Sequence, residues 1–77
     1  MKKTNYETTT YEMDNDFMMD IVSGDEVYFA YIYHSKYGIK EQMFGMYKDD
    51  ISLKAFTEIA AHNFPTFIDT YTENYMN

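Results

Sequence analysis

The sequence predicts a small α+β fold: an antiparallel β-meander of three or four strands, covered by a C-terminal helix that is kinked or broken at Pro65. The strongest strand pattern is residues 27–34, VYFAYIYH, because β-branched and aromatic side chains fit a half-buried pleated surface. After residue 52 the apolar side chains instead recur every three or four residues, which is the spacing of an amphipathic helix. A chain of 77 residues, too hydrophobic for disorder, forms a single domain, 1–77.

Two weaker strand patterns come first. Residues 1–5 are polar and we expect them to be frayed, whereas residues 6–13 carry three threonines between tyrosines, which favours a strand. The Asp-Asn-Asp sequence at 14–16 predicts a turn, because these side chains hydrogen-bond their own backbone. Phe17–Val22 alternates as a strand, although a short helix capped by a preceding aspartate fits the same residues. The Ser-Gly-Asp-Glu sequence at 23–26 favours a hairpin connection and therefore the strand.

Both faces of the strand predicted at 27–34 are apolar, whereas a strand with one solvated face alternates apolar with polar residues. One face carries Val27, Phe29, Tyr31 and Tyr33, and the other carries Tyr28, Ala30, Ile32 and His34. The helical stripe accounts for one of these faces. The other is either covered by residues 6–13 and the N-terminal arm, or is an exposed aromatic platform that a partner covers.

The segment after this strand predicts a turn and a further strand. Residues 35–38 form the turn, in which Gly38 suits a positive φ. Residues 39–48 then pair back as the next strand. Gly45 inside it marks either a bulge or the close approach of the covering helix.

The C-terminal part predicts the helix. Asp50 and Ser52 are both suitable N-caps. Pro65 removes one backbone donor and clashes with the preceding turn, so we expect a kink or a break, with residues 66–77 as a second piece. The apolar stripe consists of Leu53, Phe56, Ala60, Phe64, Phe67, Ile68, Tyr71 and Tyr75.

The charge is unevenly distributed along the chain. There are 13 acidic residues and 6 basic ones, all lysine, for a net charge of −7, and residues 4–35 contain no base. Phosphate backbones are bound by clustered Lys and Arg, so the composition disfavours direct nucleic-acid binding. An anionic membrane surface would repel the chain for the same reason. A basic protein surface is the partner that the electrostatics favour.

The same composition bears on compartment and stability. No apolar run approaches the roughly 20 residues that cross a bilayer, and no apolar segment follows Lys2 and Lys3 as a secretory signal requires. The absence of cysteine excludes disulfides and thiolate zinc sites. We therefore expect a soluble cytoplasmic protein, held together by aromatic and methionine packing and helped by oligomerisation.

Motifs for catalysis and metal binding are weak. Residues 14–16 resemble the start of a calcium-binding loop, but Met18 and Met19 stand where that loop needs an oxygen ligand and a glycine. His34 and His62 fall on separate elements, and the serines fall in turns or caps. We therefore predict that the protein is not an enzyme and has no cofactor or metal site.

The acids around the strongest strand are the most suggestive feature for function. Carboxylates on a rigid sheet can imitate a phosphate backbone and occupy the Arg and Lys of a nucleic-acid-binding protein. The hypothesis is a non-catalytic acidic protein-binding module, in its sharper form a DNA-mimic inhibitor of the anti-restriction or anti-CRISPR type found in phages and mobile elements. This comparison rests on charge and size. The predicted partner-binding residues are Glu12, Asp14, Asp16, Asp20, Asp25, Glu26, Tyr31 and Tyr33.

The same acidic and aromatic residues are also compatible with simpler roles. A solvated acidic surface keeps a small aromatic-rich domain soluble without any partner. The alternative function is a structural or assembly protein that forms a homodimer through an aromatic sheet face. A small-ligand or metal binder ranks last.

Overall fold

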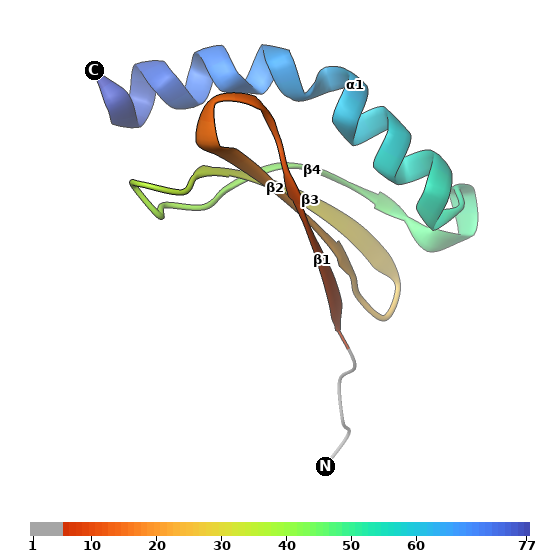
Figure 1. Cartoon of the computed structure of the whole chain (residues 1–77). Coiled ribbons are helices and arrows are strands. Elements are labelled where there is room, and N and C mark those ends of the chain that lie inside the picture. Colours follow the sequence, from red (N-terminus) through yellow and green to blue (C-terminus); the bar gives the residue numbers. More distant parts are fainter. Residues whose placement is uncertain (1–5) are drawn as a thin grey trace.

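The structure, a computed structural model, describes residues 6–77 and contains a four-stranded antiparallel sheet followed by a single C-terminal helix (Figure 1). Each strand pairs with its neighbours in the sequence, in the order β1-β2-β3-β4, so the predicted α+β meander is confirmed. The prediction that residues 1–5 are frayed lies outside the described residues. The elements are β1 (Glu7–Glu12), β2 (Phe17–Ser23), β3 (Val27–His34), β4 (Glu41–Tyr47) and α1 (Leu53–Tyr71), with 3₁₀ turns at Asp14–Asp16 and Lys48–Asp50 and a π-helical turn at Thr72–Met76.

A tight turn joins β1 to β2. Asn15 and Asp16 both have positive φ, 58° and 66°, and the Phe17 N–H donates to the carbonyl of Asp14. Two consecutive positive φ values are typical of the type I′ turn, which suits the twist of a hairpin, and Asn and Asp tolerate this conformation better than most residues. β2 then pairs along its whole length with β3. The alternative of a short helix over residues 17–22 is therefore wrong.

The core lies between α1 and the sheet face that α1 covers. The helix begins after Ser52, whose Oγ accepts a hydrogen bond from the Ala55 N–H at 3.1 Å, so Ser52 is the cap that the chain uses. Burying a large apolar side chain contributes about 1.5–3 kcal/mol, so this layer holds the helix on the sheet. Leu53 is the one member of the predicted stripe that is clearly exposed, at 42%. The core residues are Phe56, Ala60, Phe64 and Tyr71 from the helix, and Phe17, Met19, Ile21, Tyr28, Ala30, Ile32 and Met43 from the sheet.

The helix α1 runs through Pro65 without a break. The predicted division into two helices, with residues 66–77 as a second piece, is wrong, and the predicted kink is not confirmed. Proline removes the hydrogen bond to the carbonyl four residues earlier, which belongs to Ala61. Both residues are exposed, so water can reach that carbonyl on the outer side of the helix. This position is therefore one where a helix tolerates proline.

The strand β4 contains a bulge and a glycine with separate roles. The register shifts between Ala30 and Tyr31 of β3, which leaves Met43 as an extra residue with its side chain in the core. Gly45 lies opposite Phe29, and a Cβ at this glycine would stand 3.0 Å from the Tyr28 carbonyl oxygen and 3.2 Å from the Phe29 ring. Gly45 therefore makes room for the β3 backbone and for Phe29 on the uncovered sheet face. Both predictions for Gly45, the bulge itself and a close approach of the helix, are wrong.

The connection between β3 and β4 is fixed by hydrogen bonds to both layers. Gly38 has the predicted positive φ, 72°. The Tyr71 hydroxyl of α1 donates to the carbonyl of Ile39 at 2.6 Å. His34 is 8% exposed, and its Nδ1 accepts a hydrogen bond from the Lys36 N–H at 3.1 Å. His34 is thus part of the packed interior.

Candidate functional site

One face of the sheet is covered by α1, and no other described element lies over the opposite face (Figure 1). We call this opposite face the open face. β1 lies beside β2 at the edge of the sheet, so the prediction that residues 6–13 cover the open face is wrong. That prediction also included the N-terminal arm, residues 1–5, which lies outside the described residues. The apolar side chains that β2 and β3 place on the open face are half-buried, which leaves an aromatic platform without a covering layer. They are Met18, Val22, Val27, Phe29, Tyr31 and Tyr33.

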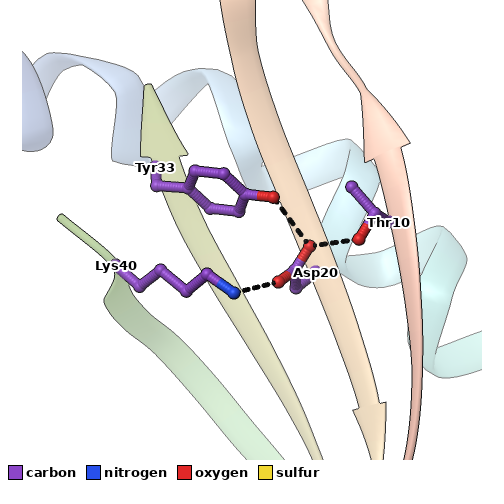
Figure 2. Close-up of polar contacts among 4 residues, drawn as sticks. All are labelled: Thr10, Asp20, Tyr33 and Lys40. Atoms are coloured by element: carbon purple, nitrogen blue, oxygen red, sulfur yellow. Dashed lines mark hydrogen bonds and ion pairs between the residues drawn. The ribbon is translucent and has the colours of Figure 1, made fainter. Parts of the chain in front are cut away.

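A buried carboxylate interrupts this platform (Figure 2). Asp20 is 2% exposed, and its Oδ1 accepts hydrogen bonds from the Thr10 hydroxyl at 2.8 Å and from the Tyr33 hydroxyl at 3.2 Å. Its Oδ2 is 2.7 Å from the Lys40 Nζ, which forms an ion pair with it. Burial of a charge is costly unless the charge is paired and hydrogen-bonded, and both conditions are met here. The cluster thus joins β1, β2, β3 and the residue before β4.

Lys40 covers this carboxylate from the solvent side. Its side chain remains 54% exposed, and its Nζ lies 5.0 Å from the centre of the Tyr33 ring. The hydrogen bond to Asp20, together with the attraction of that carboxylate charge, raises the pKa of Lys40 above its ordinary value. Asp20 therefore presents no free negative charge on the open face.

The other predicted acids lie in two groups at opposite ends of β2. The β1–β2 acids, Glu12, Asp14 and Asp16, are exposed at one hairpin turn, and the β2–β3 acids, Asp25 and Glu26, are exposed at the other. Because β2 has seven residues, the two turns are roughly 20 Å apart. The structure thus brings Tyr31 and Tyr33 onto one face and places the exposed acids at its two ends, with Asp20 neutralised between them.

The end near the β2–β3 acids carries a shallow hollow. Tyr6, Val27 and Phe29 form its apolar walls around Gly24, and Asp25 and Glu26 stand at its rim. The Tyr6 ring lies so close to Gly24 that a Cβ there would be 2.9 Å from Tyr6 Cε1.

Lys48 fixes the backbone of the same turn. Its Nζ donates to the Gly24 carbonyl at 2.6 Å and its backbone N–H donates to the Glu26 carbonyl at 2.9 Å. The β2–β3 acids are thus held on a rigid support.

The sequence pattern places Phe29 on the same face as Tyr31 and Tyr33, but the predicted partner-binding set did not include it. That set also lacked Thr10 and Lys40, which hold Asp20. Thr10 and Lys40 carry no such signal, because each is separated in the sequence from the carboxylate it contacts.

Comparison with protein-family models, curated proteins and solved structures finds no match for this chain. Within residues 6–77, no three His, Cys, Asp or Glu side chains come together in a group that could hold a metal ion. Over the same residues, no helix is both long and apolar enough to cross a membrane.

Proposed function

We propose that this protein is a non-catalytic binding module that receives a basic surface of another protein on its open face. The observation that carries this proposal is the half-buried aromatic platform between two groups of exposed carboxylates. Aromatic side chains, tyrosine in particular, are favoured at protein interfaces, and arginine stacks on tyrosine rings. Carboxylates at the rim of an interface mainly increase association rate and specificity. The platform would supply affinity, and the acids would select a basic partner.

In its sharper form, the proposal is that the partner is a nucleic-acid-binding protein whose phosphate-binding site this chain occupies. Such a site presents clustered Lys and Arg, which bind carboxylates as they bind phosphates. Two groups of acids roughly 20 Å apart on a rigid sheet would engage two separate basic clusters. Asp20 is excluded from this role, because Lys40 already pairs with it. The chain would then act as an inhibitor of the anti-restriction or anti-CRISPR type.

The test compares two variants with the same change in net charge. One neutralises acids at both ends of the open face, and the other neutralises acids on α1 and on the π-helical turn that follows it, on the far side of the sheet. Each raises the net charge from −7 to −4. Asparagine at residue 16 preserves the turn, because it also tolerates positive φ. The variants are Asp14→Asn/Asp16→Asn/Asp25→Asn and the control Glu58→Gln/Asp69→Asn/Glu73→Gln, all at exposed positions.

The assay captures partners from host extract with the immobilised protein and measures the affinity of the purified complex. We expect the open-face variant to weaken binding at least tenfold and the helix variant to leave it within about twofold. Tyr31→Ala should also weaken it, and double-stranded DNA should compete if the partner is a nucleic-acid-binding protein. Equal binding by the two charge variants would contradict the proposal. A salt-insensitive dimer of this chain, broken by Tyr31→Ala, would instead support assembly through the open face.

A further inference from the structure

The strand β1 offers an unpaired backbone edge. Within residues 6–77 it pairs with β2 alone, all six of its residues are exposed, and α1 packs on β2, β3 and β4. The Met13 N–H donates to the Phe17 carbonyl, which places Met13 in a hydrogen-bonded pair with β2. Because such pairs alternate in an antiparallel ladder, the backbone groups of Thr9 and Tyr11 face β2. Those of Thr8, Thr10 and Glu12 therefore face away from the sheet.

This edge lacks most of the features that usually prevent strand addition. Natural edge strands are protected by charged side chains, above all lysine, by proline, by bulges or by a covering element. The charged residues of β1 are Glu7 and Glu12, and they disfavour an added strand that is itself acidic. β1 contains no lysine or proline, and its register with β2 is uninterrupted from Glu7 to Glu12. The opposite edge, β4, contrasts with it, because β4 carries a bulge at Met43 and packs against α1. β1 is therefore the edge to which a further strand can be added.

The charges of β1 indicate which kind of strand can be added to this edge, a second copy of this chain or an extended segment of another protein. Glu7 and Glu12 stand near the two ends of the strand, and no base lies between them. A second copy of this chain would bring two more glutamates and another net charge of −7 to the same edge. An extended segment with Lys or Arg opposite these glutamates would bring complementary charge, and opposite charges across a strand pair are favourable.

We propose that the basic partner adds an extended segment to β1 as a fifth strand, with basic side chains opposite Glu7 and Glu12. This inference rests on the proposed function and specifies how the partner is held. Thr8 and Thr10 point to the same face as Val22 and Asp20, their register partners on β2. The added strand would therefore extend the open face, and Glu12 would serve both the new edge and the β1–β2 acids.

The test uses two capped peptides as probes, the basic KVTVTK and the acidic EVTVTE, titrated into ¹⁵N-labelled protein. We expect the basic peptide to slow amide exchange at Thr8, Thr10 and Glu12, and the acidic peptide to leave it unchanged. Two variants isolate the backbone donor, because Thr10→Pro and Thr10→Val both lack the hydroxyl but only proline lacks the N–H. Thr10→Pro should weaken basic-peptide binding at least tenfold relative to Thr10→Val. If circular dichroism shows that Thr10→Pro is unfolded, Thr8→Pro replaces it.

The outcomes separate this inference from the proposed function. If the Asp14, Asp16 and Asp25 substitutions abolish partner binding but proline at residue 10 leaves partner and peptide binding intact, the edge inference fails and the proposed function stands. If the acid substitutions have no effect, the proposed function fails. A dimer in sedimentation velocity that dissociates only in the proline variant would show that a second copy occupies the edge, and would overturn the inference.

Discussion

At the scale of single residues, Asp20 determines how the sheet is held on its uncovered side. Its carboxylate accepts hydrogen bonds from two strands and pairs with Lys40, so it contributes to three strands at once. Buried ion pairs are often no better than apolar packing, but removal of one partner is costly because the other charge stays buried. Lys40 is the partner that can be removed without opening a cavity, since more than half of its side chain is exposed.

The first prediction concerns Lys40. Lys40→Met leaves the Asp20 carboxylate with two hydroxyl donors and no counter-charge, so we expect the free energy of unfolding to fall by about 1–3 kcal/mol. Lys54→Met, at an exposed position on α1, is the control and should change it by less than about 0.5 kcal/mol. Urea denaturation followed by circular dichroism measures both. Equal effects of the two substitutions would mean that the Lys40–Asp20 ion pair adds nothing to the free energy of unfolding.

The same pair gives this prediction a pH dependence. The pKa of Lys40 is raised above 10.5 by Asp20, so its contribution to stability is complete below that pH and is lost as the pH rises through the folded-state pKa. The stability gap between wild type and Lys40→Met should therefore be constant from about pH 8 to 10 and should shrink above it. A gap that is unchanged at about pH 12 would contradict this explanation.

The role of Asp20 could not be predicted from the sequence. In the linear chain it is one of seven acids between residues 4 and 35, and Lys40 is twenty residues away. Only the strand register brings Thr10 opposite Asp20, and only the β3–β4 connection brings Lys40 to it. The exposure of Asp14, Asp16, Asp25 and Glu26 could be expected, because turn residues are rarely buried.

At the scale of elements, the sequence patterns predict strands better than the helix. The limits of β3 agree with the predicted 27–34, because both faces of that strand are apolar and turn residues stand at both ends. Of the two alternatives predicted at Pro65, a kink or a break, the break does not occur. Proline is compatible with a helix where the freed carbonyl meets water, and exposure is a tertiary property that the sequence pattern does not contain. Gly45 was misinterpreted for a similar reason, since its neighbour Phe29 comes from another strand.

The helix provides a prediction in which stability increases. Pro65→Ala restores a backbone donor to Ala61 and replaces the poorest helix former with the best, so we expect the free energy of unfolding to rise by about 1–3 kcal/mol. Thr66→Ala, at the next exposed position, changes only helix propensity and should add about 0.5 kcal/mol or less. Thermal and urea denaturation compare the three proteins. A loss of stability in Pro65→Ala would indicate that α1 needs the proline to follow the sheet.

At the scale of the whole molecule, charge repulsion opposes folding. The net charge is −7, and Lys40–Asp20 is the one ion pair within residues 6–77. Screening by salt weakens repulsion between exposed carboxylates more than it weakens a pair with a buried member. We therefore expect the melting temperature to rise by several degrees between about 10 mM and 200 mM NaCl, as measured by scanning calorimetry. A fall in melting temperature over this range would show that surface attractions dominate.

The weakly attached strand β1 also has a consequence for the fate of the chain in a cell. Within residues 6–77, β1 is attached by its ladder with β2 and by the Thr10–Asp20 hydrogen bond, without a covering helix, so it is the strand of the sheet that opens at the lowest free energy. Beneath it lies the backbone edge of β2, in whose sequence, FMMDIVS, five of the seven residues are apolar. Local opening or proteolytic removal of β1 would turn that strand into an exposed, aggregation-prone edge. A bound strand that holds β1 in place would therefore also protect the protein from aggregation.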